Sequence, residues 1–130
     1  MRIASVSENK KIEKRIAITP DIGKKYISLG FEVSLPENYG EHLGFKDSDY
    51  KETGIKIFKD EKEVLNNADV IVQLGLLSED KISLIKKNQT LIGIFNAQNN
   101  REKINILVKN NINVFSLELL PRITRAQSMD

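Results

Sequence analysis

The feature that most constrains the fold of this chain is a pair of apolar runs in its second half. They cover residues 69–74 and 90–95, and the first of them contains three consecutive β-branched residues at 70–72. A strand that is apolar on both sides is buried on both faces, which is typical of parallel sheets. We therefore predict that both segments are buried strands of a parallel sheet.

The rest of the chain alternates between strand-like and helix-like patterns. Short apolar or alternating runs predict four further strands, at residues 2–6, 31–35, 55–58 and 112–116. Five helices are expected between the strands, at residues 20–29, 47–53, 60–67, 79–86 and 100–108. Strands that alternate with helices imply right-handed crossovers. The expected fold is a three-layer α/β domain, Rossmann-like or flavodoxin-like, with a mostly parallel sheet of about six strands, and residues 1–130 are expected to form one domain.

The first helix has the clearest start signal. Thr19 is the expected N-cap, Pro20 suits the first helical position, and Asp21 complements the helix dipole. Gly30 is expected to end the helix in a left-handed conformation. The buried face should contain three side chains spaced at i, i+4 and i+7, namely Ile22, Tyr26 and Leu29. The corresponding core stripe of the last helix is predicted at Ile104, Leu107 and Val108.

Several classes of function are disfavoured by residues that the chain lacks. There is no cysteine, and His42 is the only imidazole, so no metal site is predicted. A net charge of +2 with scattered lysines and arginines gives no nucleic-acid signature. The sequence has no Gly-x-Gly-x-x-Gly motif and no P-loop. Gly75 and Gly93 are lone glycines near strand ends, and they are expected to permit close packing rather than to hold a phosphate.

The closing segment, residues 119–130, carries the densest group of directional polar side chains. It includes Arg122, Gln127 and Asp130, and it follows the predicted strand at 112–116. The carboxyl ends of parallel strands are where ligands bind in open α/β sheets. On composition alone, a solvated tail is the competing interpretation.

Two motifs carry a resemblance to a known family. Residues 121–130, Pro-Arg-Ile-Thr-Arg-Ala-Gln-Ser-Met-Asp, resemble the nicotinamide-site loop of the α subunit of proton-translocating NAD(P) transhydrogenases. Residues 13–20, Glu-Lys-Arg-Ile-Ala-Ile-Thr-Pro, resemble a run that these enzymes share with alanine dehydrogenases. The resemblance covers nearly the whole chain. The closing loop is its specific part, because alanine dehydrogenases do not carry it.

The resemblance implies that this chain is the first of two α/β domains that enclose NAD(H) in a cleft. The second, Gly-rich dinucleotide-binding domain is absent from this chain, so the chain alone is expected to be inactive. Hydride would pass between NAD(H) here and NADP(H) on the β subunit, coupled to proton movement through a membrane domain. The implied setting is bacterial and cytoplasmic, peripheral to the inner membrane through the full complex, with a homodimer as a further expectation.

The resemblance also assigns roles within the closing loop. Arg122 and Asp130 resemble a pair that orients the nicotinamide end, and Gln127 resembles an amide that approaches the ring. Gln127 and Asp130 are therefore the catalytic candidates. Further contacts to the cofactor are expected from four neighbours: Ile123, Thr124, Ser128 and Met129. Such a set suits direct hydride transfer, which requires two rings held in position and no acid or base from the protein.

The chain departs from the alanine dehydrogenase pattern at two positions. Those enzymes use a lysine and a histidine where this chain has Gln73 and Asn96, and an amide cannot perform either proton task at neutral pH. Many transhydrogenases also keep the lysine, so the consequence of Gln73 is open. Arg15 is a candidate for the cleft, or else pairs with Glu8 or Glu13. An alanine dehydrogenase-like fragment and a non-catalytic docking module are the alternative functions.

Overall fold

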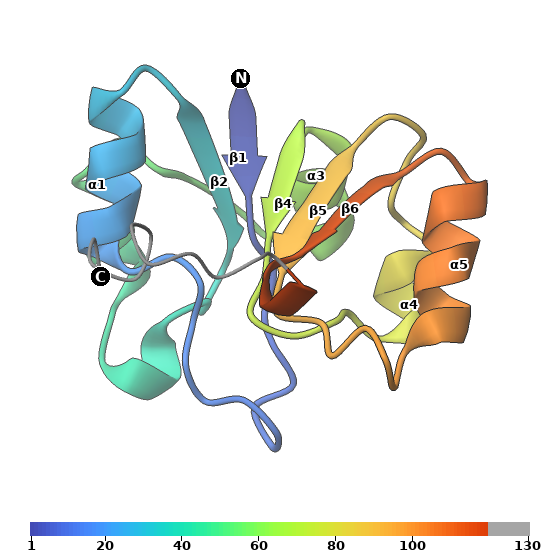
Figure 1. Cartoon of the computed structure of the whole chain (residues 1–130). Coiled ribbons are helices and arrows are strands. Elements are labelled where there is room, and N and C mark those ends of the chain that lie inside the picture. The colour runs from blue at the N-terminus through green and yellow to red at the C-terminus, as the bar shows by residue number, and fades with distance from the viewer. Residues whose placement is uncertain (120–130) are drawn as a thin grey trace, which may run out of the picture.

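The computed structural model describes residues 1–119 and shows one six-stranded sheet (Figure 1). Its order is β3-β2-β1-β4-β5-β6, and every neighbouring pair is parallel. The strands are β1 (Arg2–Ala4), β2 (Glu32–Pro36), β3 (Lys56–Phe58), β4 (Val70–Val72), β5 (Thr90–Gly93) and β6 (Asn113–Ser116). The predicted parallel sheet of six strands is therefore confirmed, and its order is the doubly wound, Rossmann-like one.

Among residues 1–119, five α-helices and one 3-10 turn lie between the strands, and a second 3-10 turn follows β6. They are α1 (Pro20–Ser28), α2 (Asp47–Lys51), α3 (Glu61–Asn66), α4 (Glu79–Ile82), α5 (Arg101–Lys109), η1 (Glu41–Leu43) and η2 (Leu117–Leu119). Strand order reverses between β1 and β4, because the chain first builds outward through β2 and β3 and then returns. Within residues 1–119, no helix has both the length and the apolar character needed to span a membrane.

The start of α1 forms as its sequence predicts. The Thr19 hydroxyl accepts a hydrogen bond from the Ile22 N–H at 3.3 Å, and Pro20 occupies the first helical position. Gly30 follows the helix with φ of +95°, a left-handed conformation that a residue with a side chain rarely adopts. The predicted cap and stop are both confirmed.

Three details of the predicted helices are wrong. Leu29 is 71% exposed because α1 ends at Ser28 and Leu29 lies at its cap, outside the buried face. Val108 is 55% exposed at the margin of α5, whereas Leu107 is fully buried. The helix predicted at 79–86 ends at Ile82, because the Lys86 N–H donates to the Gln89 side chain at 2.6 Å instead of continuing the helix.

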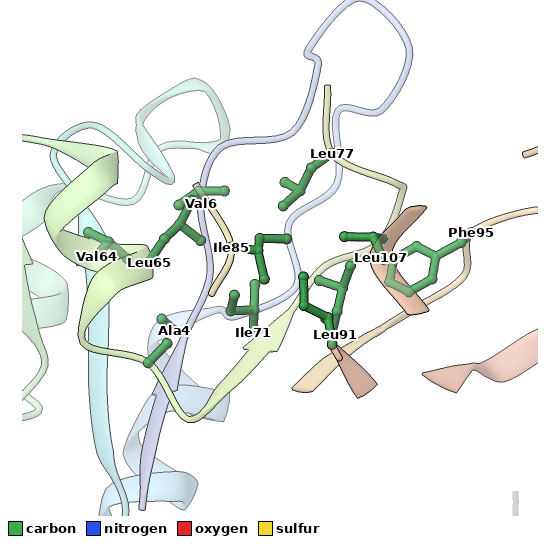
Figure 2. Close-up of a cluster of buried hydrophobic side chains, with 12 residues drawn as sticks. Ala4, Val6, Val64, Leu65, Ile71, Leu77, Ile85, Leu91, Phe95 and Leu107 are labelled. Atoms are coloured by element: carbon green, nitrogen blue, oxygen red, sulfur yellow. The ribbon is translucent and has the colours of Figure 1, made fainter. Parts of the chain in front are cut away.

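Two apolar clusters cover the two faces of the sheet. One face, which we call the Leu107 face, is packed against α3, α4 and α5 (Figure 2). Its fully buried members include Val64, Leu65, Ile71, Leu91 and Leu107. The opposite face, which we call the Tyr50 face, is packed against α1 and α2. Its buried members include Ile3, Ile18, Val33, Leu35, Tyr39, Tyr50 and Ile55. Both clusters lie between sheet and helices, as expected for three layers.

Candidate functional site at the ends of β1 and β4

The reversal of strand order places the candidate site at the carboxyl ends of β1 and β4. In open α/β sheets, ligands bind in the crevice that forms where neighbouring strands send their chains to opposite sides. Here the segment 5–8 leaves β1 and the segment 73–75 leaves β4. These two segments are more than sixty residues apart in sequence, and four hydrogen bonds of the Gln73 side chain join them directly.

Gln73 is the centre of this junction, and its side chain has no spare hydrogen-bonding position. Its amide nitrogen donates to the Val6 carbonyl at 3.0 Å and to the Glu8 carboxylate at 2.9 Å. Its amide oxygen accepts from the Ser5 hydroxyl at 2.9 Å and from the Val6 N–H at 2.8 Å. Gln73 is 2% exposed, so every polar atom of a buried amide is satisfied. The structure gives Gln73 the role of a tie between β1 and β4.

The Glu8 carboxylate binds the backbone amides that follow β4. It accepts hydrogen bonds from the Leu74 N–H at 2.8 Å and from the Gly75 N–H at 3.1 Å, in addition to the one from Gln73. Burial raises the pKa of Glu8, although the Leu74 and Gly75 amides act in the opposite direction. A carboxylate of the protein therefore binds the backbone N–H groups at the sheet edge where a ligand usually binds in α/β domains.

Tyr39 extends the junction toward α1. Because the Ser5 hydroxyl donates to Gln73, Tyr39 donates to Ser5, and their oxygens are 2.9 Å apart. The Tyr39 oxygen in turn accepts from the N–H groups of Ala17 and Ile18 at 3.1 and 3.2 Å. Burial raises the pKa of Tyr39 to about 12, so the hydroxyl keeps its proton and its role as donor.

A cavity of about 220 Å³ lies beside Glu8. It is lined by Ser7, Glu8, Asn9, Leu76, Leu77, Ser78 and Lys81. Lys81 is engaged on the wall of this cavity, because its ammonium donates to the Ser7 carbonyl at 2.9 Å and forms an ion pair with Glu61 at 3.1 Å. The cavity is small, and the lysine on its wall is already paired.

The other sequence candidates among residues 1–119 lie outside this junction. Arg15 forms its ion pair with Glu13 at 2.6 Å and leaves 79% of its side chain exposed, so Glu8 is not its partner. A place for Arg15 on the cleft stays a prediction. His42 is exposed, with its Nε2 2.7 Å from the Lys14 carbonyl. No group of three or more metal-ligating side chains occurs within the residues that the structure describes.

The two lone glycines differ in what surrounds them. A Cβ at Gly93 would overlap the Gln73 carbonyl oxygen and the Phe95 ring, which confirms close packing there. At Gly75 the nearest atom to an added Cβ is a Glu8 carboxylate oxygen at 3.5 Å, an ordinary contact. Gly75 instead contributes its N–H to an anion, a role that the sequence prediction did not assign.

The predicted nicotinamide-site residues lie outside the described residues. They are Arg122, Ile123, Thr124, Gln127, Ser128, Met129 and Asp130, and their roles stay predictions. The segment that leads to them is anchored by Glu118. Its carboxylate accepts from the Ala97 N–H at 2.9 Å and the Phe95 N–H at 3.2 Å, and from the Ser116 hydroxyl. These contacts lower the pKa of Glu118, with the Ala97 amide the largest cause.

Sequence reasoning missed the roles of Glu8 and Glu118. Each is an acidic residue that follows a strand by two to four residues. That spacing alone is a weak signal, because carboxylates near strand ends are usually solvated. Each carboxylate holds N–H groups that follow the neighbouring strand, so its role becomes visible only once the strand order is known.

The fold and this junction define a Rossmann-like parallel domain. At the switch point, where the strand order reverses between β1 and β4, the Glu8 carboxylate binds the free backbone N–H groups. Residues 5–130 match the family model described as "Alanine dehydrogenase/PNT, N-terminal domain". The chain belongs to this family.

The relatives include both transhydrogenases and alanine dehydrogenases. The chain is 36% identical to the first of the separately named parts of NAD(P) transhydrogenase subunit alpha from Rhodospirillum rubrum, over 100% of this chain and 35% of that protein. It is similar to a crystal structure of the transhydrogenase from Sinorhizobium meliloti, with a TM-score of 0.89 and 31% identity over 100% of this chain and 39% of that one. An alanine dehydrogenase of Halomonas elongata is 28% identical over 70% of this chain and 24% of its own length. The chain thus spans roughly a third of the transhydrogenase relatives that it resembles.

Proposed function

We propose that this chain is the N-terminal part of the NAD(H)-binding component of a proton-translocating NAD(P) transhydrogenase. The observation that carries the proposal is the extent of the likeness. Identity to the transhydrogenase subunit is 36% over the whole chain, whereas identity to the alanine dehydrogenase is 28% over 70% of it. The closing loop, residues 121–130, is the part by which the two groups of enzymes differ. In the proposed reaction, hydride passes between NAD(H) at this component and NADP(H) on a partner.

The described residues do not fit the phosphates of a dinucleotide at the switch point. The N–H groups of Leu74 and Gly75 already hold the carboxylate of Glu8, and a second anion there would be repelled by it. The proposal therefore places the pyrophosphate on a second domain, which is supported by the larger size of the relatives. This chain would provide the opposite wall of the cleft. Its contacts to the nicotinamide end would come from the loop that contains Arg122, Gln127 and Asp130.

The junction also argues against amino-acid oxidation. Gln73 replaces a lysine of the alanine dehydrogenases, and all four of its hydrogen-bonding positions are used within the protein. Asn96 stands where those enzymes carry a histidine, and neither amide can act as a general acid or base near neutral pH. Hydride transfer between two nicotinamide rings needs no such proton transfer. The junction therefore lacks the proton-transfer groups that a deamination needs, and the proposed hydride transfer does not require them.

The likeness supports further proposals about the assembly. The partners would be a second NAD(H)-binding domain, an NADP(H)-binding β subunit and a membrane domain, and the component would act as a homodimer. It would lie in the cytoplasm, bound peripherally to the inner membrane through the complex. A docking module without catalysis would have the same fold but no affinity for NAD(H).

The test uses the full-length α subunit together with its NADP(H)-binding partner. We expect Arg122→Ala and Gln127→Asn each to slow hydride transfer by about 100-fold, because they remove groups that hold the rings in position. The urea unfolding midpoint should stay unchanged. Arg101→Ala, an exposed arginine at the start of α5, is the matched control and should leave the rate unchanged.

Two results would contradict the proposal. One is an unchanged rate in both loop variants. The other is transfer of hydride from NADPH to an NAD analogue by residues 1–130 alone, since the proposal requires a second domain. Oxidative deamination of alanine by the full-length protein would instead favour the alanine dehydrogenase alternative.

A further inference from the structure

Beyond the ends of β5 and β6, side chains replace the backbone in holding the two chain segments together. Gly93 and Ser116 form the last register pair of the two strands. Past them, the Phe95 N–H donates to the Ser116 hydroxyl at 3.3 Å and to the Glu118 carboxylate at 3.2 Å. The second carboxylate oxygen of Glu118 accepts from the Ala97 N–H at 2.9 Å. The exit from β6, which runs through η2, is therefore held to the exit from β5 (Figure 1).

The segment that Glu118 binds is itself held in place by the rest of the domain. The Phe95 side chain is 1% exposed and belongs to the cluster on the Leu107 face. The Asn100 side-chain amide donates to the Phe95 carbonyl at 2.8 Å and to the Asn96 carbonyl at 3.3 Å. Glu118 therefore attaches its own stretch of chain to a part of the domain that is already anchored.

Stability alone does not account for this arrangement. Glu118 is exposed, and a carboxylate at the surface gains little net free energy from its donors, because water offers it similar hydrogen bonds. What the donors provide is direction, since the N–H groups of Phe95 and Ala97 bind different oxygens of one planar group. The contact therefore defines the path by which the chain leaves β6.

We propose that Glu118 is a positioning residue for the closing segment, and that its carboxylate sets where Arg122 and Gln127 meet the nicotinamide end of NAD(H). Arg122 follows Glu118 by four positions, so their Cα atoms are at most about 14 Å apart. Hydride transfer requires closely placed rings, so a small displacement of the contacts that hold a ring has a large effect on the rate. The inference rests on the proposed function and adds a residue that acts through the loop.

The test compares the binding of NADH and ADP-ribose to the full-length α subunit. ADP-ribose lacks the nicotinamide ring, so its affinity does not report on contacts at that end. In Glu118→Gln one acceptor oxygen becomes an NH₂ group that would face a backbone N–H, so the contact is lost at similar volume. We expect NADH to bind about 5-fold more weakly and ADP-ribose to bind unchanged, as measured by isothermal titration calorimetry. Glu52→Gln, at an exposed carboxylate that follows α2, is the matched control and should change neither affinity.

Kinetics with the NADP(H)-binding partner provide the second measurement. At saturating nucleotide, Glu118→Gln should slow hydride transfer by about 30-fold, a larger change than that of the KM for NADH. The double variant with Gln127→Asn should be no more than about 3-fold slower than Gln127→Asn alone, because both changes act on the same contact. The urea midpoint reports on folding. Should Glu118→Gln fold poorly, Ser116→Ala removes one donor to the carboxylate and should show the same pattern at a smaller size.

Three outcomes would overturn the inference. Equal weakening of NADH and ADP-ribose would give Glu118 a general structural role. A double variant whose slowing is the product of the two single effects would separate Glu118 from the loop. Unchanged NADH affinity and rate in Glu118→Gln, with transfer slowed in Gln127→Asn, would contradict this inference and leave the proposed function standing. If Arg122→Ala and Gln127→Asn also left the rate unchanged, the proposed function would fail and the inference with it.

Discussion

Glu8 and Glu118 perform the same structural task at two places on the sheet, with opposite effects on their own acidity. Glu8 follows β1 and accepts from two N–H groups that follow β4. Glu118 follows β6 and accepts from the N–H groups of Phe95 and Ala97, which follow β5. Burial raises the pKa of Glu8, whereas the Ala97 amide and the Ser116 hydroxyl lower the pKa of Glu118.

The difference teaches that the hydrogen bonds of a carboxylate do not by themselves set its acidity. Both residues have two backbone donors and one side-chain donor. Glu118 is exposed, so solvent stabilises its charge as well, and the donors dominate. Glu8 is largely withdrawn from water, and the loss of hydration outweighs three donors. The β1–β4 junction also contains the buried amide of Gln73 with its four hydrogen bonds, so its disruption should have the larger effect.

The largest effect is expected from Gln73→Leu. This change leaves the Val6 main chain, the Ser5 hydroxyl and the Glu8 carboxylate without their buried partner. We expect the free energy of unfolding to fall by about 4 kcal/mol, because several buried polar groups lose their hydrogen bonds together. Urea unfolding measures the loss. Gln98→Leu, at an exposed amide after β5, is the control and should change the stability by less than about 0.5 kcal/mol.

The next effect separates the two glycines. Gly93→Ala should cost about 3 kcal/mol, because the new methyl group would overlap the Gln73 carbonyl and the Phe95 ring. Gly75→Ala should cost much less, since its methyl group would meet only the Glu8 carboxylate at ordinary contact distance. Thermal unfolding of both variants checks the order. Equal losses would show that the close packing assigned to Gly93 is not specific to that strand end.

A smaller effect should appear in the pH dependence of stability. The raised pKa of Glu8 means that the folded state binds a proton more tightly than the unfolded chain, whose ordinary value is 4.5. The contribution of Glu8 to the free energy of unfolding is therefore complete below pH 4.5 and decreases as the pH rises through the raised pKa. The lowered pKa of Glu118 acts in the opposite direction, with a contribution that is present above pH 4.5 and lost as the pH falls through the lowered pKa.

Glutamine variants isolate the two contributions. Urea unfolding between about pH 3 and pH 7 should show that Glu8→Gln removes a decrease in stability toward higher pH, and that Glu118→Gln removes a decrease toward lower pH. A comparison of each variant with the unchanged protein subtracts the other carboxylates. If both variants changed the stability on the same side of the pH range, the opposite pKa shifts of Glu8 and Glu118 would be contradicted.

The smallest effect concerns the hydroxyl partner of Glu118. Ser116→Ala removes one of the donors that lower the pKa of Glu118, so this pKa should rise toward its ordinary value. Ser116 also accepts from the Phe95 N–H, which keeps its bond to Glu118, so the stability should change by only about 1 kcal/mol. A carbon-13 NMR titration of the Glu118 carboxyl measures the shift. An unchanged titration would mean that the backbone N–H groups account for all of the shift.

The sequence predicted the fold better than the site, for a physical reason. Apolar runs and helix caps are local, so the strand at 69–74 and the Thr19 cap were recognisable without any knowledge of the fold. Errors such as Val108 arose where a residue lies at the margin of a buried face. The order of the strands is not local, and the contacts of Glu8 and Gln73 depend on it. The predicted nicotinamide loop came from a resemblance, and its residues lie outside those that the structure describes.

The Tyr39 hydroxyl has a consequence for the loop that precedes α1. It bonds to Ser5 at one end and to Ala17 and Ile18 at the other, so residues 6–16 form an excursion that is closed at its base. At the tip of this excursion, Ile12 is 85% exposed. Compact surface loops with tied ends tolerate changes in length, because an insertion at the tip does not move the base. Homologous chains can therefore lengthen or shorten the tip around Ile12 without disturbing the strands beneath it.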